Sequence, residues 1–467
     1  MRNKLLAAFA LFSLFFGAGN LILPPFLGVQ AGEDWSLVAL GFVISAVLIP
    51  ILGIFAHAKL QGTIYDFGAP LGKGFSLVYA ALIYGIALAL PAPRTASVTH
   101  EMAVMPYVDS PYWLTSLLYF TFVFVVAMNR SKILDFFGKI TTPLILLVLT
   151  ALIVSALWAP EAALLPSSLP NPFGAALLEG YQTFDAIAAV VIGGVLIVSI
   201  HKSRSTAASN PAVSIASSTA TTPVATPTST ASAAQTPAHS AQASVHAAAN
   251  ENTLEGPQQM KKTLRFAAVF SATALALIYV GLIYAGAQSQ GAFTPESSRT
   301  DILQGVAQMF LGGPGVWALS VLVSLACFTT AVGVVTGTAD YVASFFPAIP
   351  ARKVYVATAA LGSVLGVLMG QLPVVHIIAI AVPALVFIYP FTIILMALHV
   401  LPAAWARPHA FKAAIVVCAL ANTPAFLDSL GYSGLQAATT FMPLSGQGLA
   451  WVLPVLGTVF VCKLIKV

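Results

Sequence analysis

Charged residues are scarce in this sequence. Lys, Arg, Asp and Glu together make up 7% of its 467 residues, whereas 58% are hydrophobic. A soluble domain needs more polar side chains than this to cover its surface, so the composition excludes a soluble globular protein. The long apolar stretches also lack the polar/apolar alternation of transmembrane β-strands. A helix crosses a hydrocarbon core of about 30 Å with roughly 20 apolar residues, so we expect an all-α polytopic membrane protein.

Cysteines are few, and motifs of catalysis are missing. The three cysteines, Cys327, Cys418 and Cys462, lie in apolar stretches, which favours buried thiols over a disulfide framework. There is no HExxH, no GxSxG and no nucleotide-binding glycine loop followed by Lys and Ser/Thr, which argues against an enzyme. No pore-lining ring of charges or repeated filter sequence is present, which argues against an ion channel.

The apolar stretches predict about twelve membrane spans. No small-residue cleavage site follows the first stretch, so we interpret it as a span rather than as a signal peptide. The predicted spans are 4–30, 36–57, 75–93, 111–128, 141–158, 173–200, 263–287, 314–345, 354–370, 374–399, 411–426 and 447–465.

Basic residues divide unevenly between the two sides of this arrangement. If the N-terminus is inside, all 20 Lys and Arg residues except Arg94 and Arg299 fall on the same side. Cytoplasmic loops are enriched in Lys and Arg, so we expect both termini to be cytoplasmic. The asymmetry accounts for the net charge of +5 without a nucleic-acid partner. The acidic residues assigned to the opposite side are Glu33, Asp34, Glu101, Asp109, Glu161, Glu179, Glu296, Asp301 and Asp428.

Residues 203–257 differ from the rest of the chain. They are almost all Ala, Ser, Thr and Pro, with no periodic apolar face. Such a segment buries too little apolar surface to offset the entropy of ordering it. We therefore expect a disordered cytoplasmic linker that separates residues 1–202 from residues 258–467. No obligate protein partner is evident.

The first predicted span contains residues that interrupt helices. FFGAGNLILPPFLG at 15–28 places two glycines, an asparagine and Pro24-Pro25 at membrane depth. Irregular backbone survives there only if it is buried in protein or lines a cavity. A break leaves free N–H groups that attract a carboxylate at one half-helix and free carbonyls that suit a cation at the other. Alternatively, the glycines serve helix packing and the prolines form a simple kink.

The sixth predicted span contains a second interruption. In EGYQTFDAIAA at 179–189, Asp185 falls near the middle of the membrane. An ionisable residue there costs roughly 2.5–3.5 kcal/mol, so Asp185 is a functional-site candidate, with a helix cap as the alternative. Breaks five spans apart are expected when two five-helix halves repeat with inverted topology. The pattern therefore predicts a transporter whose site lies between the two breaks.

Four segments of the chain carry a resemblance to a known family. They are FFGAGNLILPPFLGVQAG at 15–32, PAPRTASVTHE at 91–101, EGYQTFDAIAA at 179–189 and LACFTTAVG at 325–333. These segments resemble the branched-chain amino acid:cation symporters of the LIVCS or BrnQ type, in order and over nearly the whole chain, and only the Ser/Thr/Pro-rich insertion departs from the family.

The resemblance implies a five-plus-five inverted repeat with discontinuous helices 1 and 6 plus two C-terminal helices. It also implies Na⁺-coupled uptake of leucine, isoleucine and valine across a bacterial inner membrane. The alternatives are proton coupling through Asp185 and transport of another small apolar amino acid.

The same resemblance implies where the substrate binds. The carboxylate would meet the backbone around Ala18–Asn20, and the ammonium would meet carbonyls and hydroxyls near the two breaks. The aliphatic side chain would lie in an apolar pocket with Tyr84 and Phe184 as walls. The predicted substrate-binding residues are Phe16, Gly17, Ala18, Gly19, Asn20, Tyr84, Tyr181, Thr183, Phe184 and Asp185.

A sodium site is implied beside the first break. Na⁺ prefers hard oxygen ligands. The resemblance places the hydroxyls of Thr329 and Thr330, with the carbonyls of Ser13, Phe16 and Ala326, around one Na⁺. The alternative is that both hydroxyls bond back to carbonyls of their own helix.

Arg94 is an exception to the charge rule, and we place it near the outer end of the third span. It either closes the outward pathway by pairing with Glu101 or Glu179, or extends to the interface without a role in transport.

Overall fold

The computed structural model describes residues 5, 8–9, 11–12, 15–60, 62–128, 133–191, 257–294, 296–432 and 442–465. All regular secondary structure within these ranges is helical, which confirms the predicted all-α class. The linker predicted for 203–257 lies outside the described residues up to position 256, and Pro257 begins a helix.

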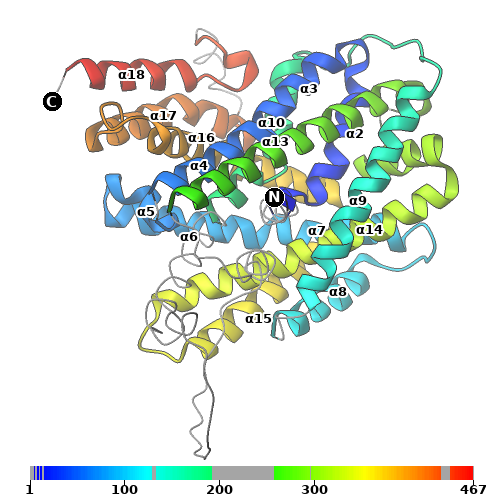
Figure 1. Ribbon diagram of the computed structural model, residues 1–467, viewed down its shortest axis with the longest axis horizontal. Coiled ribbons are helices and arrows are strands. Elements are labelled where there is room, and N and C mark those ends of the chain that lie inside the picture. Colours follow the sequence, from blue (N-terminus) through cyan, green and yellow to red (C-terminus); the bar gives the residue numbers. More distant parts are fainter. Residues whose placement is uncertain are drawn as a thin grey trace, which may run out of the picture.

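The helices follow the chain in the order drawn in Figure 1. Short 3₁₀ or π turns carry the label η. The elements are α2 (Ala18–Ala31), η1 (Gly32–Asp34), α3 (Trp35–Val43), η2 (Ile44–Leu48), α4 (Ile49–Leu60), α5 (Ile64–Gly68), η3 (Ala69–Leu71), α6 (Lys73–Ala89), α7 (Pro91–Thr99), η4 (His100–Val104), α8 (Tyr112–Met128), α9 (Ile133–Trp158), α10 (Pro172–Tyr181), α13 (Pro257–Gln288), η6 (Gln290–Ala292), α14 (Arg299–Phe345), α15 (Ala351–Gly370), α16 (Val374–Val400), α17 (Pro408–Ser429), η8 (Ser445–Gln447) and α18 (Val452–Leu464).

Many of these helices are long and apolar enough to cross a membrane. The shorter apolar helices Tyr112–Met128, Pro143–Trp158 and Val452–Leu464 coincide with three further predicted spans. The long stretches within the described residues are Gly19–Leu60, which takes in two predicted spans, Lys73–Val104, Arg265–Gln288, Arg299–Phe345, Ala351–Gly370, Val374–Val400 and Pro408–Ser429.

The third span is longer than the sequence predicts. The expected end at residue 93 is wrong, because α7 and η4 carry the helical path on to Val104. Pro91 and Pro93 occupy the first turn of α7, where no backbone donor is needed. The N–H of Arg94 then donates to the carbonyl of Leu90 at 3.3 Å, and the helix continues. Arg94 therefore lies inside the span rather than at its outer end.

The helix α2 packs among helices from distant parts of the chain. This helix packs against α13 and α14, and α10 packs against α3. α17 and α18 pack together at one edge of the molecule, away from α8 and α15. In α14, Gly312 has φ +68 and kinks the helix, so the spanning part begins close to the predicted residue 314.

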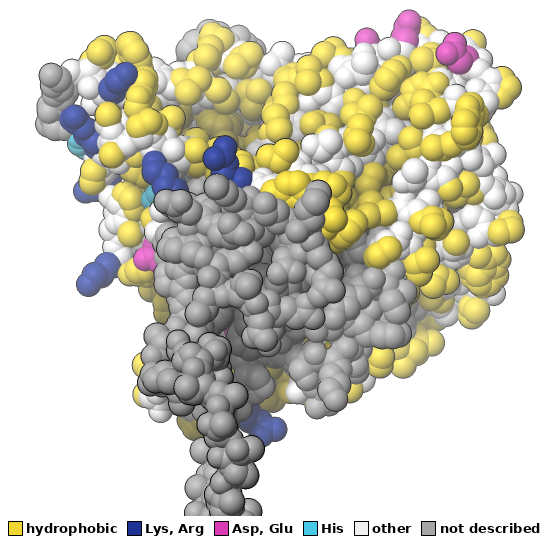
Figure 2. Space-filling model, viewed as in Figure 1, with side chains coloured by type: hydrophobic (Ala, Val, Ile, Leu, Met, Phe, Trp, Pro, Cys, Tyr) yellow, Lys and Arg dark blue, Asp and Glu magenta, His cyan; other side chains and the backbone are white. Residues whose placement is uncertain are grey.

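The surface is that of a protein surrounded by lipid. Hydrophobic side chains cover most of the visible face in Figure 2. Most Lys and Arg side chains in this view gather along one edge, and most Asp and Glu side chains lie at the opposite corner. On this face, the charged side chains of the described residues therefore gather mainly on two opposite sides.

Candidate functional site

The first helix is broken at Phe16 and Gly17. The N–H of Phe16 donates to Phe12 O at 3.0 Å and closes the inner turn. Gly17 is extended, and its N–H donates to Oδ1 of Asn20 at 3.2 Å, before α2 begins at Ala18. The first N–H groups of a helix have no intrahelical acceptor, so this end of α2 attracts negative charge. The helix continues through Pro24 and Pro25, which lie beyond the break.

The second break follows α10. Gln182, Thr183 and Phe184 leave the helical path, and a helix resumes at Asp185. Phe184 has φ +62, a left-handed conformation that is costly for a residue with a side chain and persists only where surrounding structure enforces it. The hydroxyl of Thr183 donates to Gly180 O at 2.9 Å and accepts the N–H of Asp185 at 3.3 Å. Thr183 therefore bridges the two sides of the break.

The two breaks contact each other deep in the protein. Nδ2 of Asn20 donates to Oδ2 of Asp185 at 2.6 Å and also to the hydroxyl of Tyr279 on α13. Asn20 is 0% exposed and Asp185 3% exposed. Gly19 lies against the second break, because a Cβ there would come within 3.1 Å of the carbonyl oxygen of Gln182 and 3.2 Å of Cα of Thr183.

Arg94 also reaches this junction. Its side chain is 3% exposed, and its Nη1 donates to the carbonyl oxygen of Gln182 at 2.7 Å. The guanidinium carbon lies 5.0 Å from the ring centroid of Phe184. A Cβ on Gly19 would approach Nη2 of Arg94 to 2.5 Å. Arg94 is thus part of the candidate site, which sequence reasoning missed because it ended the span at residue 93, whereas the helical path continues to Val104.

The structure shows neither of the two arrangements that the sequence offered for Arg94. Its burial excludes extension to the interface. Glu179 pairs instead with Nη2 of Arg299 at 2.7 Å. The carboxylate of Glu101 accepts the hydroxyl of Thr300 at 2.6 Å and the N–H of Val374 at 2.9 Å.

The ion pair between Glu179 and Arg299 joins α10 to the start of α14, with the guanidinium 4.2 Å from the ring of Phe26. The two side chains are 16% and 17% exposed, so we expect a coupling of at most about 1 kcal/mol. A double-mutant cycle with Glu179→Gln and Arg299→Gln, followed by thermal melting, would measure it. The coupling should shrink at high salt through screening; equal coupling at low and high salt would contradict this expectation.

Unpartnered polar atoms gather at the second break. In the described part of the chain, Nε of Arg94, the hydroxyl of Tyr181 and Oε1 of Gln182 are buried near this break without a hydrogen-bond partner. The rings of Tyr181 and Tyr389 lie 4.4 Å apart. Buried polar atoms are nearly always paired in proteins, so three unpaired ones near one break indicate a place for a polar ligand.

The threonine pair predicted for the cation lies next to the first break. A Cβ on Gly17 would be 3.7 Å from Oγ1 of Thr330. Both Thr329 and Thr330 donate to the carbonyl oxygen of Ala326 at 2.9 Å, as in the back-bonded alternative. These bonds leave hydroxyl lone pairs open to a cation but occupy the carbonyl of Ala326. Ser13 lies outside the described residues.

Tyr84, predicted as a wall of the substrate pocket, contacts an aromatic residue of another helix. Its ring stacks on Tyr341 of α14 at 3.9 Å. Within the described residues, no ring contact joins Tyr84 to Phe184. Phe16, in contrast, is buried and stacks on Phe12 at 5.0 Å, beside the first break.

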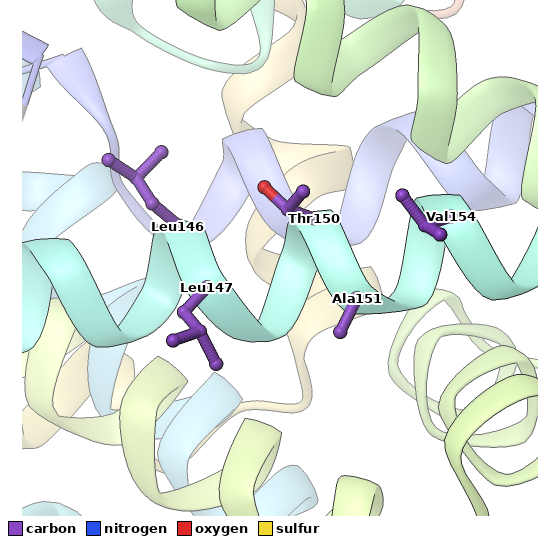
Figure 3. Close-up of a pocket in the computed structure, with 5 residues that line it drawn as sticks. All are labelled: Leu146, Leu147, Thr150, Ala151 and Val154. Atoms are coloured by element: carbon purple, nitrogen blue, oxygen red, sulfur yellow. The ribbon is translucent and has the colours of Figure 1, made fainter.

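A surface depression on α9 is unrelated to this site. Figure 3 shows it lined by Leu146, Leu147, Thr150, Ala151 and Val154, all from one helix. Its lining is almost entirely apolar, and Leu147 is exposed, as expected of a face that contacts lipid.

Two discontinuous helices whose breaks meet among buried polar groups define the class of inverted-repeat secondary transporters. The fold is shared with a substrate-bound, outward-open Na⁺-coupled sialic acid symporter (TM-score 0.53, 11% identity, 99% of this chain and 90% of that chain). It is shared also with a nucleobase-cation-symport-1 family transporter (TM-score 0.54, 14% identity, 98% and 90%). The chain belongs to the family of branched-chain amino acid transport proteins, whose sequence profile matches residues 1–227 and 242–467.

Its relatives are named as carriers and permeases. The branched-chain amino acid transport system 2 carrier protein of Pseudomonas aeruginosa is 29% identical over 465 residues, covering 97% of this chain and 93% of the relative. The branched-chain amino acid permease BrnQ of Salmonella typhimurium is 28% identical over 464 residues, with the same coverage. The protein is therefore a transporter and not an enzyme.

Proposed function

We propose that the protein is a Na⁺-coupled symporter that takes up leucine, isoleucine and valine by alternating access. The observation that carries this proposal is the meeting of the two helix breaks at Asn20 and Asp185 in a member of this family. Two helix ends and two buried side chains of opposite charge, Arg94 and Asp185, match the two poles of an amino acid zwitterion. The apolar side chain of the substrate would lie against aromatic residues near the breaks.

The energetics suit this coupling. Moving one Na⁺ inward with a neutral zwitterion gains about 2.3 kcal/mol per 100 mV of membrane potential. Since about 1.4 kcal/mol corresponds to a tenfold change, the potential alone supports roughly fifty-fold accumulation. The sodium concentration gradient adds to this.

Leucine uptake into proteoliposomes tests the proposal. Radiolabelled leucine should accumulate when a Na⁺ gradient is imposed, and isoleucine and valine should compete with it. Accumulation driven by a pH gradient and indifferent to Na⁺ would contradict sodium coupling. Failure to transport any branched-chain amino acid would contradict the substrate.

Thr330→Ala should raise the Na⁺ concentration for half-maximal uptake by about tenfold, because one hard oxygen ligand is lost. Uptake at saturating Na⁺ should change less. Thr458→Ala is a matched control, since Thr458 makes the same back bond, to Pro454 O at 2.8 Å, on the peripheral helix α18. An identical Na⁺ dependence in Thr330→Ala and Thr458→Ala would exclude the threonine pair from the cation site.

Proton coupling through Asp185 is the second candidate. The observation that favours it is the burial of this carboxylate, whose side-chain oxygen accepts from Asn20. In this case Asp185→Asn should abolish uptake driven by a pH gradient while leaving exchange of internal for external leucine intact. Under sodium coupling, the same variant should impair both.

The placement in the cell is part of the proposal. We place the protein in a bacterial inner membrane with both termini cytoplasmic and the linker on the cytoplasmic side, between residues 1–202 and 258–467. The gathering of Lys and Arg at one edge of the molecule in Figure 2 supports this orientation.

A further inference from the structure

Arg94 carries a buried positive charge that makes no direct ion pair within the described residues. In the described part of the chain, Glu179 forms an ion pair with Arg299, and no ion pair links Arg94 to Asp185. Its only hydrogen bond within these residues is from Nη1 to the carbonyl of Gln182, whereas its Nε is buried and unpartnered. A guanidinium has five N–H donors, and a buried charge is costly unless an opposite charge satisfies it. A carboxylate bound beside Arg94 would satisfy both this charge and the unpartnered Nε.

The guanidinium is also held firmly in one place. The ring of Phe184 lies beneath it at 5.0 Å, and the left-handed backbone of Phe184 sets that ring there. The carbonyl of Gln182 anchors one nitrogen, and Gly19 lies directly against another. A planar guanidinium group fixed in this way is suited to bidentate binding of a carboxylate.

The guanidinium of Arg94 lies beside the N-terminal end of α2, which carries a partial positive charge. Gly19, whose missing Cβ makes room for Nη2 of Arg94, belongs to the first turn of that helix. The free N–H groups of this turn and the guanidinium therefore attract a negative group to the same place. The carboxylate of Asp185 bonds to Asn20 through Oδ2 and makes no direct ion pair with Arg94 within the described residues.

We infer that Arg94 binds the carboxylate of the transported amino acid directly, together with the first turn of α2. This inference rests on the proposed function and adds to it a substrate-binding residue that carries a full charge. It makes Arg94 the residue that selects substrates with a free carboxylate. The opposite pole of the zwitterion then points toward Asp185 and the unpartnered hydroxyl of Tyr181.

The test compares leucine with leucinol, in which a CH₂OH group replaces the carboxylate. Apparent affinities come from the ligand-induced rise in melting temperature of the purified protein in Na⁺ buffer. Arg94→Gln should weaken leucine binding by about 10- to 100-fold, as expected for a lost charge-assisted bond, and leave leucinol binding within about threefold. Arg94→Lys should weaken leucine binding by an intermediate factor, because Lys keeps the positive charge but lacks the planar guanidinium that binds a carboxylate through two N–H groups.

Leucinol binding shows that the variant is folded, and Arg352→Gln, at an exposed position at the start of α15, controls for removal of an arginine. An unchanged leucine-to-leucinol ratio in Arg94→Gln, with leucine uptake by the wild type intact, overturns this inference alone. If Arg94→Gln binds neither ligand, an unchanged ratio in Arg94→Lys overturns it. A wild type that neither binds nor transports leucine overturns the proposed function as well.

A second arm separates the substrate carboxylate from an inorganic anion. Leucine binding should be the same when gluconate replaces chloride in the buffer. A requirement for chloride would mean that chloride occupies the position beside Arg94, and would overturn the inference.

Discussion

Gly19→Ala is expected to lower leucine uptake by at least about 100-fold, because displacement of a reacting or binding group by about 1 Å has effects of this size. A Cβ at this position would lie 2.5 Å from Nη2 of Arg94 and 3.1 Å from the carbonyl oxygen of Gln182. The two breaks would have to separate, and the guanidinium would have to leave its carbonyl acceptor. The measurement is initial-rate uptake in proteoliposomes at matched protein content.

Gly17→Ala is the matched control for this variant. Gly17 lies in the same break, but a Cβ there would have its nearest neighbour at 3.7 Å, an ordinary contact. Its φ of −115 suits any residue. Gly17→Ala should therefore keep most of the uptake. Equal loss in both variants would mean that the break needs glycine for flexibility rather than for contact.

Asn20→Ala should have a comparable effect through lost hydrogen bonds. One amide side chain donates to Asp185 and Tyr279 and accepts the N–H of Gly17, so its removal leaves a buried carboxylate and a helix end unsatisfied. Leaving a buried charge unpaired costs about 3–5 kcal/mol. We expect uptake to fall by more than about 100-fold and the melting temperature to drop.

Asn422→Ala separates stability from function. Asn422 is also a buried asparagine, and its Nδ2 donates to Val386 O at 2.8 Å between α17 and α16, away from the breaks. This variant should lose stability by about 1–2 kcal/mol and retain uptake. If Asn20→Ala resembles Asn422→Ala in both measurements, the bond across the breaks has no part in transport.

The residues of the two breaks were predictable because helix-disrupting and charged residues are unfavourable inside a membrane. Gly17, Gly19 and Asn20 disrupt a helix where no water can satisfy its backbone, and Asp185 carries a charge at the same depth. Only a buried polar site tolerates both. The inverted repeat predicted a site between the two breaks, but the bond of 2.6 Å between Asn20 and Asp185, which are 165 residues apart, came only from the structure.

The sequence pattern did not determine the roles of Arg94 and of the threonine pair. Residues 91–93 contain two prolines, which in sequence mark the end of a helix equally well as the first turn of the next. Thr329 and Thr330 are equally compatible with back-bonding and with cation binding, and their hydroxyls do donate to Ala326. Which use prevails depends on neighbours from other helices.

The sequence by itself determined the membrane class, the helical fold and the two breaks, because hydropathy and helix-breaking residues act locally along the chain. Only the tertiary structure decided that Arg94 is buried at the junction, that Glu179 pairs with Arg299, and that Gly19 lies against the second break. The physical reason is that burial and pairing of a charge depend on which helices pack together. Arg94, which the sequence placed at the end of a helix, becomes part of the candidate site because the carbonyl of Gln182 from another segment lies 2.7 Å from its Nη1.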